Sequence, residues 1–109
     1  MITIDKNAGT LTVMVVFTLD TAEDQPVLLE AIRTFIQDVV RHQPGFVSST
    51  VHASDDGTRV INYAQWENQG AFAAFQANPD AMNRRGDIMR FDQEGHTYRI
   101  AFQVEGAAS

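Results

Sequence analysis

The sequence predicts an α+β domain in which a four-stranded antiparallel sheet carries helices on one face. Three observations lead to this prediction. Four stretches have the β-branched and aromatic residues, or the strict alternation, that are typical of strands. Helical stretches separate the first strand from the second and the third from the fourth. An Asp-Gly pair joins the two middle strands as a hairpin. The resulting order, βαββαβ, is the ferredoxin-like arrangement.

The first strand and helix are predicted from residues 11–43. Residues 11–19 (LTVMVVFTL) have few polar interruptions, which favours a central strand. Asp20 and Thr21 are candidate N-caps for the helix that follows. Its apolar residues recur at helical spacing: Leu28, Ile32, Phe35, Ile36, Val39 and Val40. Pro44 predicts that this helix has ended.

The hairpin is predicted over residues 46–53 and 58–66. If Asp56 and Gly57 form the centre of the turn, Val51 lies opposite Asn62 and Ala53 lies opposite Val60. Because side chains alternate along a strand, one face of the hairpin then carries a common set of residues. That set is Ser49, Val51, Asn62, Ala64 and Trp66.

The last third of the chain predicts two short helices and a strand. The first helix spans residues 67–77, and Asn78 with Pro79 ends it and caps the second, over residues 81–91. The final strand is predicted over residues 96–104 from its alternating apolar residues. We expect a single domain over residues 1–109, with residues 1–10 as an N-terminal extension and residues 105–109 as a flexible tail.

Composition excludes several classes of function. The net charge of −6 argues against a nucleic-acid-binding surface, because phosphate binding requires a basic face. The absence of cysteine excludes disulfides and thiolate chemistry, and the three histidines lack metal-ligand spacing. No apolar run approaches the roughly 20 residues of a membrane span. The N-terminal residues lack the pattern of a signal peptide, so we expect a cytoplasmic protein without a membrane partner.

The predicted sheet also has a second face that no helix of this chain can cover. Its alternation places large or apolar residues there, among them Met14, Val16, Ile61 and Tyr63. An exposed apolar face of this size is unfavourable in water. We therefore predict a homodimer in which two sheets pack face to face.

Asn62 and Trp66 are the candidate catalytic residues. Both carry hydrogen-bond donors, and their spacing of four puts them on one face of the same strand. Two structural alternatives stay open: Asn62 hydrogen-bonded to neighbouring backbone or to water, and Trp66 as a core aromatic. Other residues could line a pocket around this pair or simply fill the core. They are Val51, Phe72, Phe75, Met82, Arg85 and Met89.

One segment resembles a known family. Residues 52–72 (HASDDGTRVINYAQWENQGAF), together with the PGF of residues 44–46, resemble antibiotic biosynthesis monooxygenases (ABM). They are particularly similar to the cofactor-independent enzymes that oxidise polyketide anthrones to quinones. The resemblance implies a dimeric α+β barrel with one pocket per subunit and an active-site pair at Asn62 and Trp66. Those enzymes have a tyrosine where this chain has Phe72.

The resemblance implies a monooxygenase of antibiotic biosynthesis that uses O2 as co-substrate and needs no cofactor or metal. Its substrate would be an anthrone or a related phenol or hydroquinone. Two alternatives remain: a general quinol monooxygenase, and a non-catalytic dimer that binds aromatic ligands or is associated with stress. The haem-degrading branch ranks low, because residues 67–91 contain no histidine to bind iron.

Overall fold

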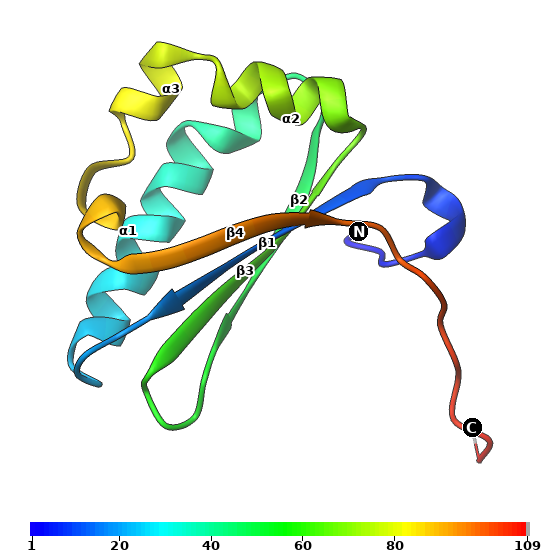
Figure 1. Ribbon diagram of the computed structural model, residues 1–109, viewed down its shortest axis with the longest axis horizontal. Coiled ribbons are helices and arrows are strands. Elements are labelled where there is room, and N and C mark those ends of the chain that lie inside the picture. The colour runs from blue at the N-terminus through cyan, green and yellow to red at the C-terminus, as the bar shows by residue number, and fades with distance from the viewer. Residues whose placement is uncertain (109) are drawn as a thin grey trace.

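The computed structural model describes residues 1–108 and has the predicted element order (Figure 1). The strands and helices are β1 (Leu11–Thr18), α1 (Asp24–Asp38), β2 (Phe46–Ala53), β3 (Arg59–Trp66), α2 (Gln69–Gln76), α3 (Pro79–Asn83) and β4 (Asp92–Tyr98). The four strands form one antiparallel sheet in the order β2-β3-β1-β4, and the helices lie on one side of it. The predicted fold class is confirmed.

The β2–β3 hairpin has the predicted register. Val51 pairs with Asn62 and Ala53 pairs with Val60. Gly57 has a φ of 77°, in the region that favours glycine, and the loop is closed by the side chain of Asp56. The Asp56 carboxylate accepts hydrogen bonds from Thr58 Oγ1 at 2.7 Å, Ser54 Oγ at 2.8 Å and Thr58 N at 2.9 Å. These bonds, those from Thr58 above all, lower the pKa of Asp56 to about 2.

The hydrophobic core lies between the sheet and the helical layer. Near one end it joins β1 and β3 to α1 and to the 3₁₀ turn Gly86–Arg90, through Phe17, Leu28, Ile32, Val60 and Ile88. Near the other end it is built from Val13, Val40, Ala64 and Trp66, with α2 packed against them. The two clusters share partly buried neighbours, so the core is continuous along the sheet.

Two predicted helix boundaries are wrong. Helix α1 begins at Asp24 rather than after Asp20 or Thr21, and no side chain among residues 1–108 caps it. The helix predicted over residues 81–91 is instead the short α3 followed by the 3₁₀ turn Gly86–Arg90. Gly86, with a φ of 55°, interrupts the right-handed helical path. The predicted cap is confirmed, since Asn78 Oδ1 accepts from the backbone of Asp80 and Ala81.

The last strand begins four residues and ends six residues earlier than predicted. Strand β4 pairs with β1 from Asp92 opposite Thr18 to Tyr98 opposite Thr12. Tyr98 is the last residue of the β1–β4 ladder in the described part of the chain, and Gln103 beyond it hydrogen-bonds through its side chain to the backbone of Ile4 and Lys6 instead. Phe102 is 76% exposed and Val104 is 83% exposed, on a segment that extends away from the body (Figure 1). Of the predicted tail 105–109, Ser109 lies outside the described residues.

The sheet face opposite the helices is partly covered by the N-terminal segment. Gln65 on β3 is buried there and donates to the backbone oxygen of Thr3 and to Ser48 Oγ, both at 3.0 Å. Its Oε1 accepts from Thr10 Oγ1 at 3.2 Å. Met14 and Tyr63 on the same face are only half-buried. Within residues 1–108, no helix has the length and apolarity needed to cross a membrane.

Candidate active site

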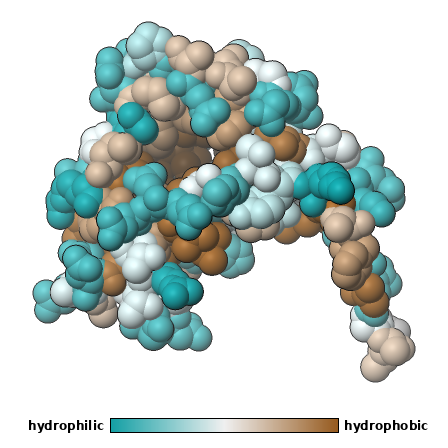
Figure 2. All heavy atoms as spheres, viewed as in Figure 1, coloured by the Kyte–Doolittle hydropathy of each residue, from teal (hydrophilic) through white to brown (hydrophobic). Residues whose placement is uncertain are grey.

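A cavity of about 180 Å³ lies between the helical layer and the sheet. Figure 2 shows the molecule hollowed between the helices and the sheet, with hydrophobic residues visible inside the hollow. Strands β1 and β3, helices α1 and α2, and the α3 region all contribute to the wall. The lining residues are Val13, Val15, Phe17, Ile32, Phe35, Ile36, Val40, Ser49, Asn62, Ala64, Trp66, Phe72, Phe75, Gln76, Met82, Arg85, Ile88 and Gln93.

Asn62 brings an amide into this mainly apolar cavity. It lies in the middle of the sheet, opposite Val15 on β1 and Val51 on β2. Its Oδ1 is buried and has no hydrogen-bond partner within residues 1–108. A buried amide oxygen without a partner costs about 1–3 kcal/mol. Strand packing does not explain this residue, because an apolar side chain at the same position would avoid that cost.

Trp66 is 2% exposed and lies among three phenylalanines. It stacks on Phe75 with ring centroids 5.0 Å apart and meets the edge of Phe46 at 5.3 Å. Phe72 is tilted against it at 5.6 Å. Trp66 is therefore a core aromatic, as the packing interpretation has it, and it also forms part of the cavity wall; its catalytic role stays a prediction.

Four further predicted residues reach the cavity. Phe72 and Phe75 come from α2, Met82 comes from α3, and Arg85 follows α3. Arg85 is held in place by a hydrogen bond of 2.8 Å from its Nε to the backbone oxygen of Met82. Arg85 is the one lining residue with an ionisable side chain, so the cavity as described contains no carboxylate or imidazole that could act as a base.

Val51 and Met89 lie elsewhere. Val51 lines a separate groove with Leu29 of α1, and both Ile36 and Ser49 line this groove as well as the cavity. Met89 would follow Met82 and Arg85 on one face of a continuous helix. Because Gly86 turns the chain, Met89 is instead 52% exposed on the 3₁₀ turn.

Ser49 is a lining residue that the sequence did not single out. Alternation placed it on the same face as Asn62, but a strand serine carries no signal that separates a cavity wall from a surface. In the structure its Oγ is buried without a hydrogen-bond partner among residues 1–108, like Oδ1 of Asn62. Two unsatisfied polar atoms therefore belong to residues of the same cavity.

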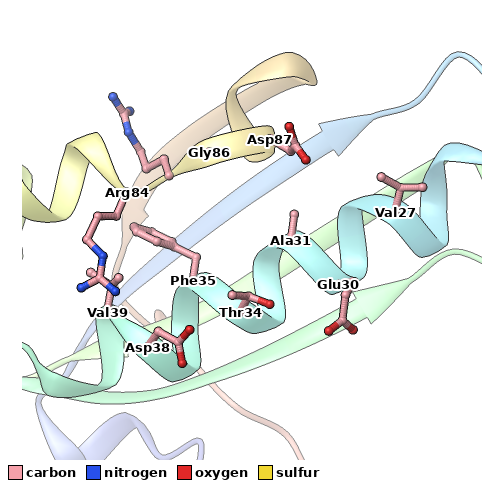
Figure 3. Close-up of a pocket in the computed structure, with 11 residues that line it drawn as sticks. Val27, Glu30, Ala31, Thr34, Phe35, Asp38, Val39, Arg84, Gly86 and Asp87 are labelled. Atoms are coloured by element: carbon pink, nitrogen blue, oxygen red, sulfur yellow. The ribbon is translucent and has the colours of Figure 1, made fainter.

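A wider groove adjoins the cavity on its outer side. It runs between α1 and the segment from Arg84 to Asp87, and Phe35 and Arg85 line both spaces. Figure 3 shows Arg84 extending toward the end of α1 that carries Asp38. Over the described part of the chain, no group of three or more histidine, aspartate or glutamate side chains could hold a metal ion.

Comparison with known proteins identifies the family and the fold. The family model described as "Antibiotic biosynthesis monooxygenase" matches residues 10–83, which include β1 to α3 and most of the cavity wall. The chain belongs to the antibiotic biosynthesis monooxygenase (ABM) family. The family predicted from the sequence is thereby confirmed, and with it the expected class of enzyme, a monooxygenase.

Individual ABM relatives agree with this assignment. The chain is 40% identical over 79 residues to tetracenomycin-F1 monooxygenase of Streptomyces glaucescens, covering 72% of this chain and 70% of the relative. A monooxygenase from the gene ActVA-Orf6 of Streptomyces coelicolor, solved with the ligand nanaomycin D, superimposes with a TM-score of 0.80. It is 28% identical and covers 95% of this chain and 100% of its own. SnoaB of Streptomyces nogalater, described as a cofactor-independent oxygenase, shares the fold at 19% identity with a TM-score of 0.67, covering 90% of this chain and 99% of its own.

Proposed function

We propose that this protein oxidises an aromatic polyketide anthrone, or a related phenol or hydroquinone, to a quinone with O2 and without a cofactor. The observation that carries the proposal is Asn62, whose amide oxygen has no hydrogen-bond partner within residues 1–108 and which lines a cavity walled by Trp66, Phe72 and Phe75. The 40% identical relative is named as a monooxygenase of tetracenomycin F1, which supports an aromatic polyketide substrate.

The reactivity comes from the substrate. Loss of a proton from an anthrone gives an electron-rich enolate, which passes one electron to O2. The two radicals combine at carbon to form a C–O bond, and the resulting hydroperoxide loses water to leave the carbonyl of the quinone. In balance, a CH2 group and O2 become a C=O group and H2O.

The protein's part in this reaction is to favour the deprotonated substrate. The amide N–H groups of Asn62 and the indole N–H of Trp66 are donors that can stabilise negative charge on the substrate oxygen. Among residues 1–108, those that line the inner cavity include no carboxylate or imidazole, so the proton leaves to water or to a neighbouring oxygen of the substrate. A largely apolar wall strengthens each hydrogen bond to the developing charge.

The size of the cavity sets a condition on binding. About 180 Å³ is small beside the roughly 300–1,000 Å³ of most ligand sites. A substrate of several fused rings would extend past Phe35 and Arg85 into the outer groove. That groove carries the guanidinium groups of Arg84 and Arg85 together with the carboxylates of Glu30, Asp38 and Asp87 (Figure 3). We therefore expect the reacting ring to lie in the inner cavity and polar substituents to lie in the groove.

A homodimer belongs to this proposal. The sheet face opposite the cavity keeps Met14, Val16 and Tyr63 half-buried, and every residue of β4 is exposed in the single chain. A second copy packed on this face would bury these side chains.

The deciding experiment measures O2 consumption and quinone absorbance with purified, chelator-treated protein and emodin anthrone or dithranol. We expect oxidation faster than the uncatalysed rate, retained in chelator and lost in Trp66→Phe, which removes the N–H and keeps most of the bulk. Equal rates for wild type and buffer would reject anthrone oxidation. Equal rates for wild type and Trp66→Phe would show that the indole N–H takes no part in the reaction and that Trp66 only packs in the core.

Phe72 favours a second candidate, a non-catalytic protein that binds aromatic ligands. This side chain lines the cavity without a hydroxyl group to donate a proton or hydrogen bond. Calorimetric binding of a hydroxyanthraquinone without any acceleration of anthrone oxidation would support the binder. Turnover that appears only in Phe72→Tyr would identify the missing hydroxyl as the reason.

A further inference from the structure

Ser49 lines the cavity but has no task in the proposed function. Its Oγ is buried and has no hydrogen-bond partner within residues 1–108, and the same is true of Oδ1 of Asn62. Buried polar atoms are almost always satisfied in folded proteins, either by the chain itself or by a bound molecule. Because the described chain supplies no partner, the partner of these two atoms has to come from a molecule held in the cavity.

The strand register places the two side chains at a distance that one bound group can bridge. Ser49 pairs with Ala64 and Val51 pairs with Asn62, so Ser49 and Asn62 are diagonal neighbours on one face of the β2–β3 ladder. Diagonal positions lie about 7–8 Å apart, which is too wide for a serine and an asparagine to meet directly. Two hydrogen bonds of about 2.7–3.0 Å each, one to either side of a bound group, can cover this separation. A serine hydroxyl also turns about the Cα–Cβ bond without a change in the backbone.

A hydroxyl group is the simplest partner that satisfies both atoms. Asn62 Oδ1 only accepts hydrogen bonds, whereas Ser49 Oγ can donate one. A hydroxyl placed between them donates to Oδ1 and accepts from Oγ. Water can do the same when no ligand is bound, and a ligand that displaces such a water without replacing its hydrogen bonds loses affinity.

We propose that Ser49 and Asn62 together bind a hydroxyl group of the substrate, which makes Ser49 a specificity-determining residue. This hydroxyl lies next to the ketone oxygen, because the NH2 group of Asn62 stays free to donate to that oxygen. It is the one polar substituent held in the inner cavity, while the others extend into the outer groove. The inference rests on the proposed function, which places the ketone oxygen at Asn62.

Equilibrium dialysis with three quinones tests this preference without reference to turnover. 1-Hydroxyanthraquinone carries its hydroxyl beside the carbonyl, 2-hydroxyanthraquinone carries it one carbon further away, and anthraquinone has none. Ser49→Thr keeps the side-chain hydroxyl, and Ser49→Val has nearly the same shape without it. Ser49→Thr should bind 1-hydroxyanthraquinone about tenfold more tightly than Ser49→Val, the size of one hydrogen bond. The two variants should bind the other two quinones equally.

Two further variants control for packing. Ser49→Ala adds no bulk and should repeat the loss relative to wild type, so the test stands even where a larger side chain distorts the wall. Thr12→Val removes another hydroxyl that is buried without a partner within residues 1–108. Thr12 lies opposite Gln65, on the face of the sheet away from the cavity, so its removal should leave all three affinities unchanged.

The outcomes separate this inference from the proposed function. Equal binding of 1-hydroxyanthraquinone by Ser49→Thr and Ser49→Val, or by wild type and Ser49→Ala, would overturn the hydroxyl site and leave the proposed oxidation untouched. Failure of wild type to bind any of the three quinones would reject an aromatic ligand in the cavity, and with it both the proposed function and this inference.

Discussion

At the scale of single residues, the cavity combines side chains that stabilise the fold with one that does not. Trp66 and Phe75 stack at 5.0 Å and contribute to the core as well as to the wall. Asn62 differs, because its buried oxygen is unpaired in an apolar setting where valine or leucine would pack at no such cost. A residue that is poorly explained by packing is a candidate for selection by function.

Asn62→Ala should therefore separate activity from stability. We expect turnover of an anthrone to fall on the order of 100-fold, the effect of losing one donor at a developing oxyanion. The variant should remain folded, since the substitution removes one amide and leaves the aromatic wall in place. Steady-state kinetics with circular dichroism checks both expectations. Turnover within a factor of two of wild type would show that Asn62 does not contribute to the reaction.

At the scale of elements, the position of α2 depends on Gly45. This glycine has a φ of 85°, and a Cβ added to it would lie 2.4 Å from Cβ of Ala71 on α2. The close approach sets how deeply Phe72 and Phe75 reach over the sheet.

Gly45→Ala should push α2 away from the hairpin. We expect a loss of about 2–5 kcal/mol, because about 1–3 kcal/mol of overpacking adds to about 1–2 kcal/mol of left-handed backbone strain. Gly9→Ala is the control for strain alone, with a φ of 70° and no atom within 4 Å of the added Cβ. Urea denaturation compares the two variants. Equal losses would show that contact with Ala71 does not position α2.

The ionised side chain of Asp56 should stabilise the loop of the β2–β3 hairpin, and this stabilisation should be lost in acid. Its pKa is lowered from 3.8 to about 2, mainly by hydrogen bonds from Thr58 and then from Ser54. The folded state binds this proton less readily than the unfolded state, so the stabilisation is complete above about pH 4 and is lost as pH falls toward 2.

The difference in melting temperature between wild type and Asp56→Asn should accordingly stay constant from pH 7 to pH 5 and shrink toward zero near pH 2. Asp55→Asn changes the same charge one residue away and controls for net charge. A difference that does not vary with pH would show that the Asp56 carboxylate does not brace the loop.

The elements that could be predicted from the sequence are those fixed by local chemistry. Strand β2 and the hairpin register followed from the Asp-Gly turn, and the start of α3 followed from the Asn78 cap. The end of β4 is set by the length of its neighbour β1, which alternation in residues 98–104 does not reveal. Met89 lies outside the predicted site because Gly86 interrupts the helix that would have placed it there. Ser49 was not predicted because the burial of a strand hydroxyl depends on tertiary packing, which the local sequence does not reveal.

At the scale of the whole molecule, the two faces of the sheet have different tasks. One face carries the helices and the cavity, while the other keeps a half-buried apolar surface beside the N-terminal segment. If the proposed dimer forms, a charged residue introduced on this second face should destabilise the dimer more than a charged residue introduced on the helical side.

Ile61→Glu should convert the dimer to a monomer. Ile61 lies on β3 opposite Val16, in the middle of the face without helices. Val27→Glu is the control, because Val27 is exposed on α1 and belongs to the helical layer. Light scattering should give about twice 12.1 kDa for wild type and Val27→Glu, and 12.1 kDa for Ile61→Glu. A mass of 12.1 kDa for wild type at micromolar concentration would contradict the dimer.

The aromatic cluster around Trp66 also makes the protein its own optical probe. The chain has one tryptophan, and that residue is 2% exposed on the cavity wall. Its fluorescence should be blue-shifted, as an indole in a dry environment emits. A quinone or anthrone that absorbs in the near ultraviolet and enters the cavity would quench this emission by energy transfer. Occupancy of the site can then be titrated on the unlabelled protein, under argon, before any oxygen is admitted.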